Sequence, residues 1–297
     1  MSDSINFLDP TVLAGLSNLE LRARVVVEGF LSGLHKSPNR GFSVEFNDYR
    51  HYQRGDDMRH VDWKLYARSD KFYIKQYEDE TNVRCMIVLD TSASMDYTSG
   101  GVSKLNYGVT LASALAYFIM RQRDAVGLIT FDEDIREYLP ARCRQPHLMH
   151  ILRTLSRVES GHKTNAVKPL SDLAATLTKK SMVILITDML DDEERVINTL
   201  QNLRGMGNDV ITFQIMDDAE LNFPFSEASE FIDMENNETY ITSPVAIRKA
   251  YLENLNEFLG FCRKKCQSSG VDYTLLNTAK PLDEALSSYM SKRAKSF

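Results

Sequence analysis

Residues 86–94, MIVLDTSAS, decide the fold predicted for this 297-residue chain. Four apolar residues follow one another without polar alternation, which is typical of a strand buried on both faces. The run ends at Asp90, and Ser92 and Ser94 follow at every second position. In an extended-to-turn conformation these three side chains face one point, while the residues between them point away. The stretch therefore predicts a buried strand with a polar site at its carboxyl end.

Similar apolar runs alternate with helical patterns from residue 84 to the end of the chain. The runs predicted as strands are residues 84–90, 125–131, 135–140, 181–188, 209–216 and 271–278. The helical patterns lie near residues 104–122, 147–157, 168–179, 193–206, 244–268 and 282–293. Buried strands rich in Val, Ile and Leu that alternate with helices indicate a mostly parallel sheet with helices on both faces. Only residues 132–134 separate the second and third runs, so we expect a hairpin there and one antiparallel edge strand.

The first 80 residues differ in character from the rest. Residues 10–34 predict one helix, with Asp9 as its cap and an apolar stripe along one face. Residues 41–80 mix charged side chains with Tyr and include the only Trp, Trp63, which predicts short strands in an ordered, charge-laced appendage. The predicted parts are an N-terminal helix with this β-rich appendage over residues 1–80, and an α/β domain over residues 81–297 with an insertion at residues 221–243.

Composition and charge narrow the classes of function. Lys and Arg number 35 and Asp and Glu 41, a net charge of −6, so electrostatics give no reason to expect nucleic acid as a partner. No stretch approaches the roughly 20 apolar residues of a membrane-spanning helix, and the first residues lack the basic segment and apolar core of a secretory signal. The four Cys lack the spacing of a metal site, and we expect Cys262 and Cys266, four apart on a predicted helix, to be reduced core residues. We therefore expect a soluble, cytoplasmic protein without membrane insertion.

A second aspartate ends another predicted strand. Asp188 closes the fourth apolar run, and Thr164 lies in a loop before the next helical pattern. If the first and fourth strands are neighbours, Asp90 and Asp188 lie in one crevice beyond the carboxyl edge of the sheet. One carboxylate with the hydroxyls of Ser92 and Ser94 makes a hard, all-oxygen set that suits Mg²⁺. Its low charge would leave the ion electrophilic, so that an acidic side chain of a partner could replace a water ligand.

Two other interpretations of Asp90 stay open. In the first, Asp90 and the two serines only cap the turn that follows, because Asp and Ser are favoured caps. In the second, Asp90 is a nucleophile for phosphoryl transfer. That chemistry generally needs a second acid two residues on, where Ser92 stands, and the serines lack the G-x-S-x-G frame of a hydrolase. No His stands out as a base. We therefore expect no catalytic activity.

These residues resemble those of a known family. Asp90, Ser92 and Ser94, with a loop Thr and a strand-end Asp, resemble the metal-ion-dependent adhesion site of von Willebrand factor type A domains. Residues 40–68, RGFSVEFNDYRHYQRGDDMRHVDWKLYAR, and residues 271–293, VDYTLLNTAKPLDEALSSYMSKR, resemble family fifty-eight of the domains of unknown function, whose members contain such a domain. The pattern in the first segment comprises Arg50, Tyr52, Gly55, Asp56, Asp57, Arg59, Asp62, Trp63, Ala67 and Arg68.

The resemblance implies a Rossmann-like von Willebrand type A domain with the site at its top. It also implies no known catalytic activity and common association with AAA+ ATPases of the MoxR group. By this resemblance Asp90, Ser92 and Ser94 form the first metal loop, Thr164 the second and Asp188 the third.

Together, the residues and the resemblance predict a non-catalytic, metal-dependent interaction module. It would bind a partner carboxylate through Mg²⁺, or Mn²⁺, and would work with a MoxR-like AAA+ ATPase and a client protein. One alternative is a metal-independent scaffold that binds through residues 41–80. The other is a Mg²⁺-dependent hydrolase that uses Asp90.

Overall fold

The computed structural model forms two compact units, Met1–Ser32 with Val83–Phe297, and Gly33–Asn82. The residues that it describes are 9–36, 49–51, 73–75, 83–161, 165–177, 180–226, 229–232, 234 and 239–295. In the smaller unit, β1 (Tyr49–His51) pairs antiparallel with β2 (Tyr73–Lys75), in agreement with the short strands expected there. Of the family-like pattern over residues 50–68, Arg50 lies in β1, and the other residues, Trp63 included, lie outside the described residues.

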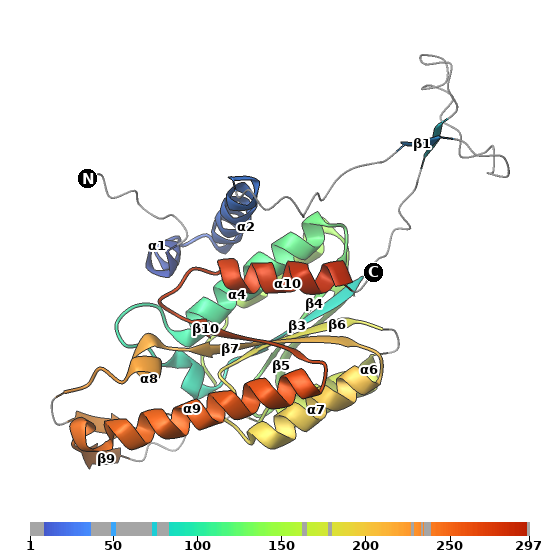
Figure 1. The fold of residues 1–297 in the computed structure, drawn as a ribbon. Helices are drawn as coiled ribbons and strands as arrows, with labels where there is room; N and C mark the ends of the chain where they lie inside the picture. Colours follow the sequence, from blue (N-terminus) through green and yellow to red (C-terminus); the bar gives the residue numbers. More distant parts are fainter. Residues whose placement is uncertain are drawn as a thin grey trace. The chain divides into compact units, whose positions relative to one another are not determined.

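A six-stranded sheet forms the centre of the larger unit (Figure 1). Its strands are β3 (Arg84–Asp90), β4 (Ala125–Phe131), β5 (Ile135–Arg142), β6 (Met182–Thr187), β7 (Asp209–Met216) and β10 (Asp272–Asn277). They lie in the order β10-β7-β6-β3-β4-β5, and every neighbouring pair is parallel except β4 with β5. The mostly parallel sheet with one antiparallel edge strand is therefore confirmed, and β3 and β6 are neighbours near its middle.

Helices cover both faces of the sheet, as the alternation predicted. On one face lie α4 (Lys104–Arg121), α5 (Gln145–Leu155) and α10 (Asp283–Lys295). On the other lie α6 (Val167–Thr176), α7 (Glu193–Gly205) and α9 (Pro244–Ser268). Buried residues occur all around α4, because α5 and α10 pack on it from two sides; the rings of Phe118 and Tyr289 meet edge to face at 5.8 Å.

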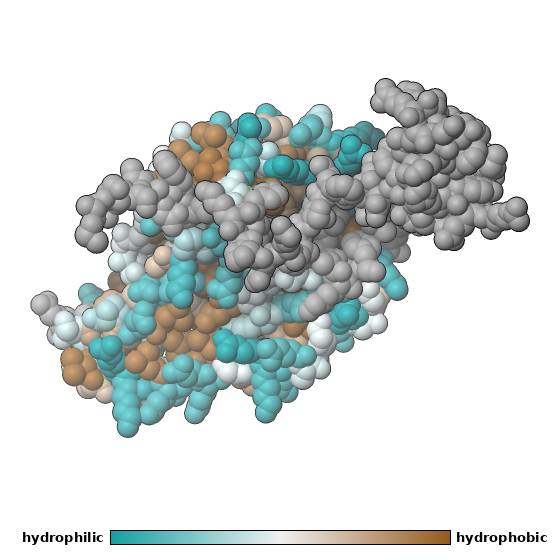
Figure 2. All heavy atoms as spheres, turned by 45° about the horizontal axis from the view of Figure 1, so that its top comes forward, coloured by the Kyte–Doolittle hydropathy of each residue, from teal (hydrophilic) through white to brown (hydrophobic). Residues whose placement is uncertain are grey.

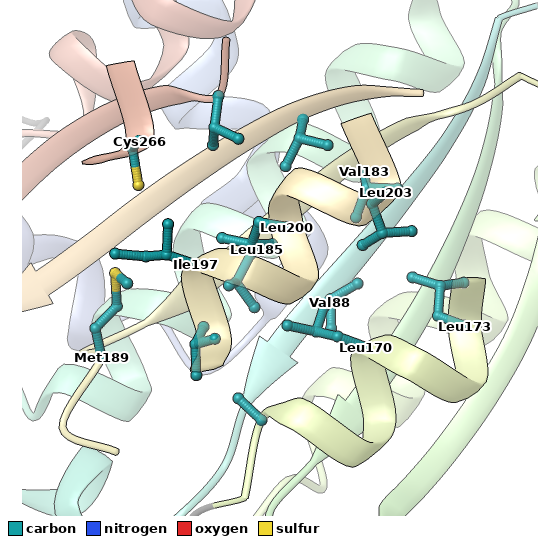
Figure 3. Packing of buried hydrophobic residues seen from close by; sticks show 14 of the residues in the cluster. Val88, Leu170, Leu173, Val183, Leu185, Met189, Ile197, Leu200, Leu203 and Cys266 are labelled. Carbon is teal, nitrogen blue, oxygen red and sulfur yellow. The ribbon is translucent and has the colours of Figure 1, made fainter. Parts of the chain in front are cut away.

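The core on the α6–α7 face is continuous and apolar (Figure 3). Val88 and Leu185 of the sheet pack beneath Leu170 of α6 and Leu200 of α7. Each such fully buried side chain contributes about 1.5–3 kcal/mol through removal from water. Cys266 of α9 lies in the same cluster and is fully buried, as expected for a reduced core cysteine.

The N-terminal segment forms two helices, and the single helix predicted over residues 10–34 is wrong. The first helix, α1, spans only Pro10–Ala14, and the second, α2, spans Leu19–Lys36. Asn18 precedes α2, and its side chain accepts a hydrogen bond from the Leu21 amide at 3.1 Å. Arg22 of α2 reaches back to the connection between the two helices, where its Nη2 donates to the carbonyls of Ala14 and Leu16 at 3.1 and 2.7 Å. The buried guanidinium thus satisfies the carbonyls that a continuous helix would have bonded internally.

The segment predicted as an insertion, residues 221–243, holds a two-stranded hairpin. β8 (Ser229–Ile232) and β9 (Thr239–Thr242) pair antiparallel after the short helix α8 (Asp218–Asn222). Ile232 of the hairpin and Val245 of α9 are exposed by 59% and 67%. In Figure 2 brown hydrophobic atoms are visible among teal side chains at the lower left, over the end of the unit that carries the hairpin in Figure 1.

None of the helices described combines the length and the apolar composition that crossing a bilayer requires.

Gly127 provides a test of the edge strand. A Cβ there would lie 2.6 Å from the carbonyl oxygen of Leu139 and 2.8 Å from the amide nitrogen of Ala141, both backbone atoms of β5 that cannot move freely. We expect Gly127→Ala to lower the free energy of unfolding by about 1–3 kcal/mol, as overpacking does. Urea denaturation measures this change.

Gly260 is the matched control, because it lies in α9 with nothing within 4 Å of an added Cβ. Gly260→Ala should leave stability unchanged or raise it by about 0.5–1 kcal/mol through helix propensity. Equal effects of the two substitutions would contradict the close packing of β4 against β5.

Candidate metal centre

Parallel pairing of β3 with β6 brings the two strand-end aspartates to one edge of the sheet. Leu89 lies opposite Ile186 in the register, so Asp90 follows directly beside Thr187. The Thr187 hydroxyl donates to Oδ2 of Asp90 at 2.7 Å. Asp188 comes next along the chain, and both carboxylates are fully buried. The predicted neighbourhood of Asp90 and Asp188 is therefore present.

The two serines turn their hydroxyls toward each other. Beyond Asp90 the chain forms a short 3₁₀ helix, Ala93–Asp96. Oγ of Ser92 and Oγ of Ser94 lie 3.1 Å apart, and both side chains are buried. Two neighbouring ligands of an octahedral Mg²⁺, each at about 2.1 Å, lie about 3 Å apart. The spacing of the hydroxyls therefore fits a shared hard cation.

The capping interpretation accounts for only part of this geometry. Oδ1 of Asp90 does accept a hydrogen bond from the Ser92 amide, at 2.9 Å, as a capping aspartate would. Ser92 stands at the cap position of the 3₁₀ helix, yet its side chain makes no capping hydrogen bond. The hydroxyl faces Ser94 instead, so capping alone does not explain its position.

Burial and charge make Asp90 an unusual carboxylate. Burial is the main cause that raises its pKa to about 7, and the negative charge of Asp188 adds to this effect. Hydrogen bonds from Thr187 and Ser92 act in the opposite direction. A carboxylate with this pKa is one whose negative charge the protein does not fully compensate. A cation beside Asp90 would supply the missing compensation.

Lys104 is the functional residue that the sequence did not indicate. It is the first residue of α4, and its ammonium is buried between Asp188 and Glu220, with N–O distances of 2.9 and 2.8 Å. Burial opposes the charged form, but the two carboxylates prevail and raise the pKa of Lys104. A lysine at the start of a helix ordinarily extends into water, so its sequence position carried no signal.

The charges of these four groups do not balance. Asp90, Asp188 and Glu220 carry three negative charges when ionised, and Lys104 carries one positive charge. The remaining two negative charges equal the charge of one divalent cation. The charge and the oxygen donors of Asp90, Ser92 and Ser94 therefore both fit Mg²⁺.

Thr164, predicted as the second metal loop, lies outside the described residues. The chain on either side of it reaches the same edge of the sheet. The Gly161 amide donates to the Thr91 carbonyl at 2.6 Å, and the Asn165 amide donates to the Asp132 carbonyl at 3.0 Å. Coordination by Thr164 itself stays a prediction.

Other metal or catalytic groups are not gathered at this edge in the described part of the chain. No set of three or more His, Cys, Asp or Glu side chains there is placed to hold a metal ion. His147 of α5 contacts the carbonyl of Val126, near the amino end of β4. It therefore lies at the other end of the parallel strands from Asp90. The oxygen set of Asp90, Ser92 and Ser94 is therefore the candidate site.

The strand order and the antiparallel edge strand agree with the Rossmann-like, von Willebrand factor type A-like fold that the sequence predicted. The family model described as "Protein of unknown function DUF58" matches residues 48–257. The chain belongs to this family.

The chain is similar to distant relatives in sequence and to solved structures. The uncharacterized protein Rv1480 of Mycobacterium tuberculosis is 25% identical over 221 residues, which cover 73% of this chain and 68% of that protein. An aerotolerance-related membrane protein from Bacteroides fragilis superposes with a TM-score of 0.51 at 18% identity, over 71% of this chain and 99% of that one. The hypothetical protein BatB from Bacteroides thetaiotaomicron gives 0.49 at 20% identity, over 72% and 99%. At 18% identity, the likeness to the Bacteroides fragilis protein is one of fold alone.

The raised pKa of Asp90 predicts how metal-free stability changes with pH. Between pH 3.8 and about 7 the folded state keeps a proton that the unfolded state has lost, so the free energy of unfolding falls as the pH rises. Asp90→Asn removes the buried charge. We expect this variant to exceed wild type by about 1–3 kcal/mol at pH 8 in EDTA, and to lose this part of the pH dependence.

Chemical denaturation at several pH values between 5 and 8 measures both effects. A variant less stable than wild type at pH 8, with an unchanged pH profile, would contradict the uncompensated charge at Asp90.

Proposed function

We propose that the chain is a non-catalytic interaction module that binds a carboxylate of a partner protein through Mg²⁺. The observation that carries this proposal is the buried Asp90, which accepts hydrogen bonds from neutral groups, the Ser92 amide and the Thr187 hydroxyl, and stands beside the paired hydroxyls of Ser92 and Ser94. These three side chains would hold the ion, and Asp188 would act directly or through water. Bound Mg²⁺ would supply a Lewis-acidic position that a partner carboxylate can occupy.

The surroundings of Asp90 favour binding over catalysis. Both of its oxygens accept hydrogen bonds, from the Ser92 amide and the Thr187 hydroxyl, which holds the carboxylate in place rather than freeing it for attack. The position two residues on is Ser92, where a phosphoryl-transfer enzyme would carry an acid. The site therefore offers ligands for a cation without a matching general acid.

Leu190 supplies an apolar contact next to the proposed ion. Its side chain is 42% exposed, and its amide donates to Oδ1 of Asp188 at 3.1 Å. Interfaces commonly combine an apolar contact with a charged anchor. We include Leu190 in the surface that meets the partner.

For the partners we propose a MoxR-group AAA+ ATPase and a client protein. This rests on family membership and on the association that the resemblance implies. The ATPase would supply energy, while this chain would select or position the client. A location in the cytoplasm stays a prediction.

Metal binding is the first test. Titration calorimetry with Mg²⁺ and the electron paramagnetic resonance signal of Mn²⁺ should show one site in wild type. Asp90→Ala removes the carboxylate ligand and should abolish binding, while circular dichroism shows the fold unchanged. Equal binding by Asp90→Ala would disprove the proposed ligand set.

Partner capture is the second test. We expect partners to be retained from a cell lysate by wild type in Mg²⁺, and lost in EDTA or with Asp90→Ala. Leu190→Ser should weaken capture without changing Mn²⁺ binding. Met206→Ser is its control, because Met206 is also exposed, by 54%, but follows the far end of α7.

The two alternatives give different outcomes in the same experiment. Partners retained under all three conditions and lost with Trp63→Ala would favour a metal-independent scaffold that uses residues 41–80. Turnover of a phosphoester that disappears with Asp90→Asn would favour the hydrolase.

A further inference from the structure

The ammonium of Lys104 belongs to the first residue of a helix, a position where the helix dipole disfavours a cation. Lys104 is the first residue of the 18-residue helix α4, with Ser103 as its cap. The amino end of a helix carries a partial positive charge, so a lysine there is opposed by the helix dipole. Burial adds a desolvation cost. Its contacts with Asp188 and Glu220 must offset both effects, so these carboxylates are the reason for its position.

Both carboxylate oxygens of Asp188 accept a hydrogen bond in this arrangement. Oδ2 accepts from the Lys104 ammonium at 2.9 Å, and Oδ1 accepts from the Leu190 amide at 3.1 Å. Asp188 is also the third residue of the proposed metal set. Lys104 and a divalent ion near Asp90 therefore draw on the same carboxylate.

Glu220 holds the ammonium from the other side. Its Oε1 accepts from Lys104 at 2.8 Å, while its Oε2 accepts from the Asp217 amide at 2.8 Å and closes the capping box of α8. The capping box fixes Glu220 in place. Lys104 is thus shared between a carboxylate fixed on α8 and a carboxylate at the metal site.

We propose that Lys104 is an internal counter-ion that competes with the divalent ion for Asp188 and so lowers the metal affinity of the isolated protein. This inference rests on the proposed metal site. Glu220 moderates the competition, because it draws the ammonium away from Asp188. A partner carboxylate that completes the coordination then raises metal affinity, and by linkage the metal raises affinity for the partner equally.

Mn²⁺ affinity of four full-length proteins tests the proposal: wild type, Glu220→Gln, Lys104→Met with Glu220→Gln, and Lys104→Arg. The double variant has the same net charge as wild type, because it loses one positive and one negative charge. Changes in residues around metal ligands typically alter affinity about 10–100-fold. Without the ammonium, Asp188 is released, and we expect the double variant to bind Mn²⁺ about tenfold more tightly.

The two single variants have different expected effects on Mn²⁺ affinity. Glu220→Gln leaves the ammonium to Asp188 alone, so Mn²⁺ affinity should fall below that of wild type. Lys104→Arg keeps a positive charge between the two carboxylates, so its Mn²⁺ affinity should lie closer to that of wild type than to that of the double variant. Circular dichroism and thermal unfolding verify that each variant is folded; a variant that is not is replaced by Lys104→Gln with Glu220→Gln, which keeps the same charge balance.

The outcomes separate this inference from the proposed function. Asp90-dependent binding in wild type with equal affinity in the double variant would overturn the role of Lys104 and leave the metal site intact. Binding in no protein would overturn both. Asp90-dependent binding that appears only in the double variant would support the counter-ion, because the ammonium then blocks the site.

Discussion

The parallel pairing of β3 with β6 is the constraint on which the rest of the molecule depends. Because both strands run in the same direction, their last residues meet at one edge, and Asp90 comes to lie beside Thr187 and near Asp188. Apart from Arg84, every residue of the two strands is buried between two helical layers. Two carboxylates are therefore held in a place where water compensates their charge only weakly.

The buried charges of the two aspartates are compensated to different extents. Asp188 receives the ammonium of Lys104, whereas Asp90 receives neutral donors such as the Thr187 hydroxyl and the Ser92 amide. A buried carboxylate with neutral donors alone is costly to keep ionised, and its pKa rises accordingly. In the function that we propose this energetic cost has a use, because the same group would be a strong ligand for a hard cation. The proposed metal site and the proposed counter-ion are thus two consequences of one buried charge imbalance.

Local sequence patterns determined much of the fold. All six strands of the central sheet and the six long helices around it lie close to the runs expected from apolar periodicity. The patterns failed at the N-terminus, where one stripe over residues 10–34 concealed a break. That break depends on Asn18 and on the guanidinium of Arg22, which reaches back to the Ala14 carbonyl. Periodicity records which side a residue faces, and it does not record such capping contacts.

By itself, the sequence determined the α/β architecture and the candidate oxygen ligands Asp90, Ser92 and Ser94, because strand period and strand-end polarity are local properties of the chain. Only the tertiary structure decided that Asp188 lies beside them and that the ammonium of Lys104 is bound by both Asp188 and Glu220. These residues are 84 and 116 positions apart from Lys104 along the chain. Charge pairs of that kind depend on which strands become neighbours and on how deeply they are buried, and no pattern within a short window of sequence encodes either.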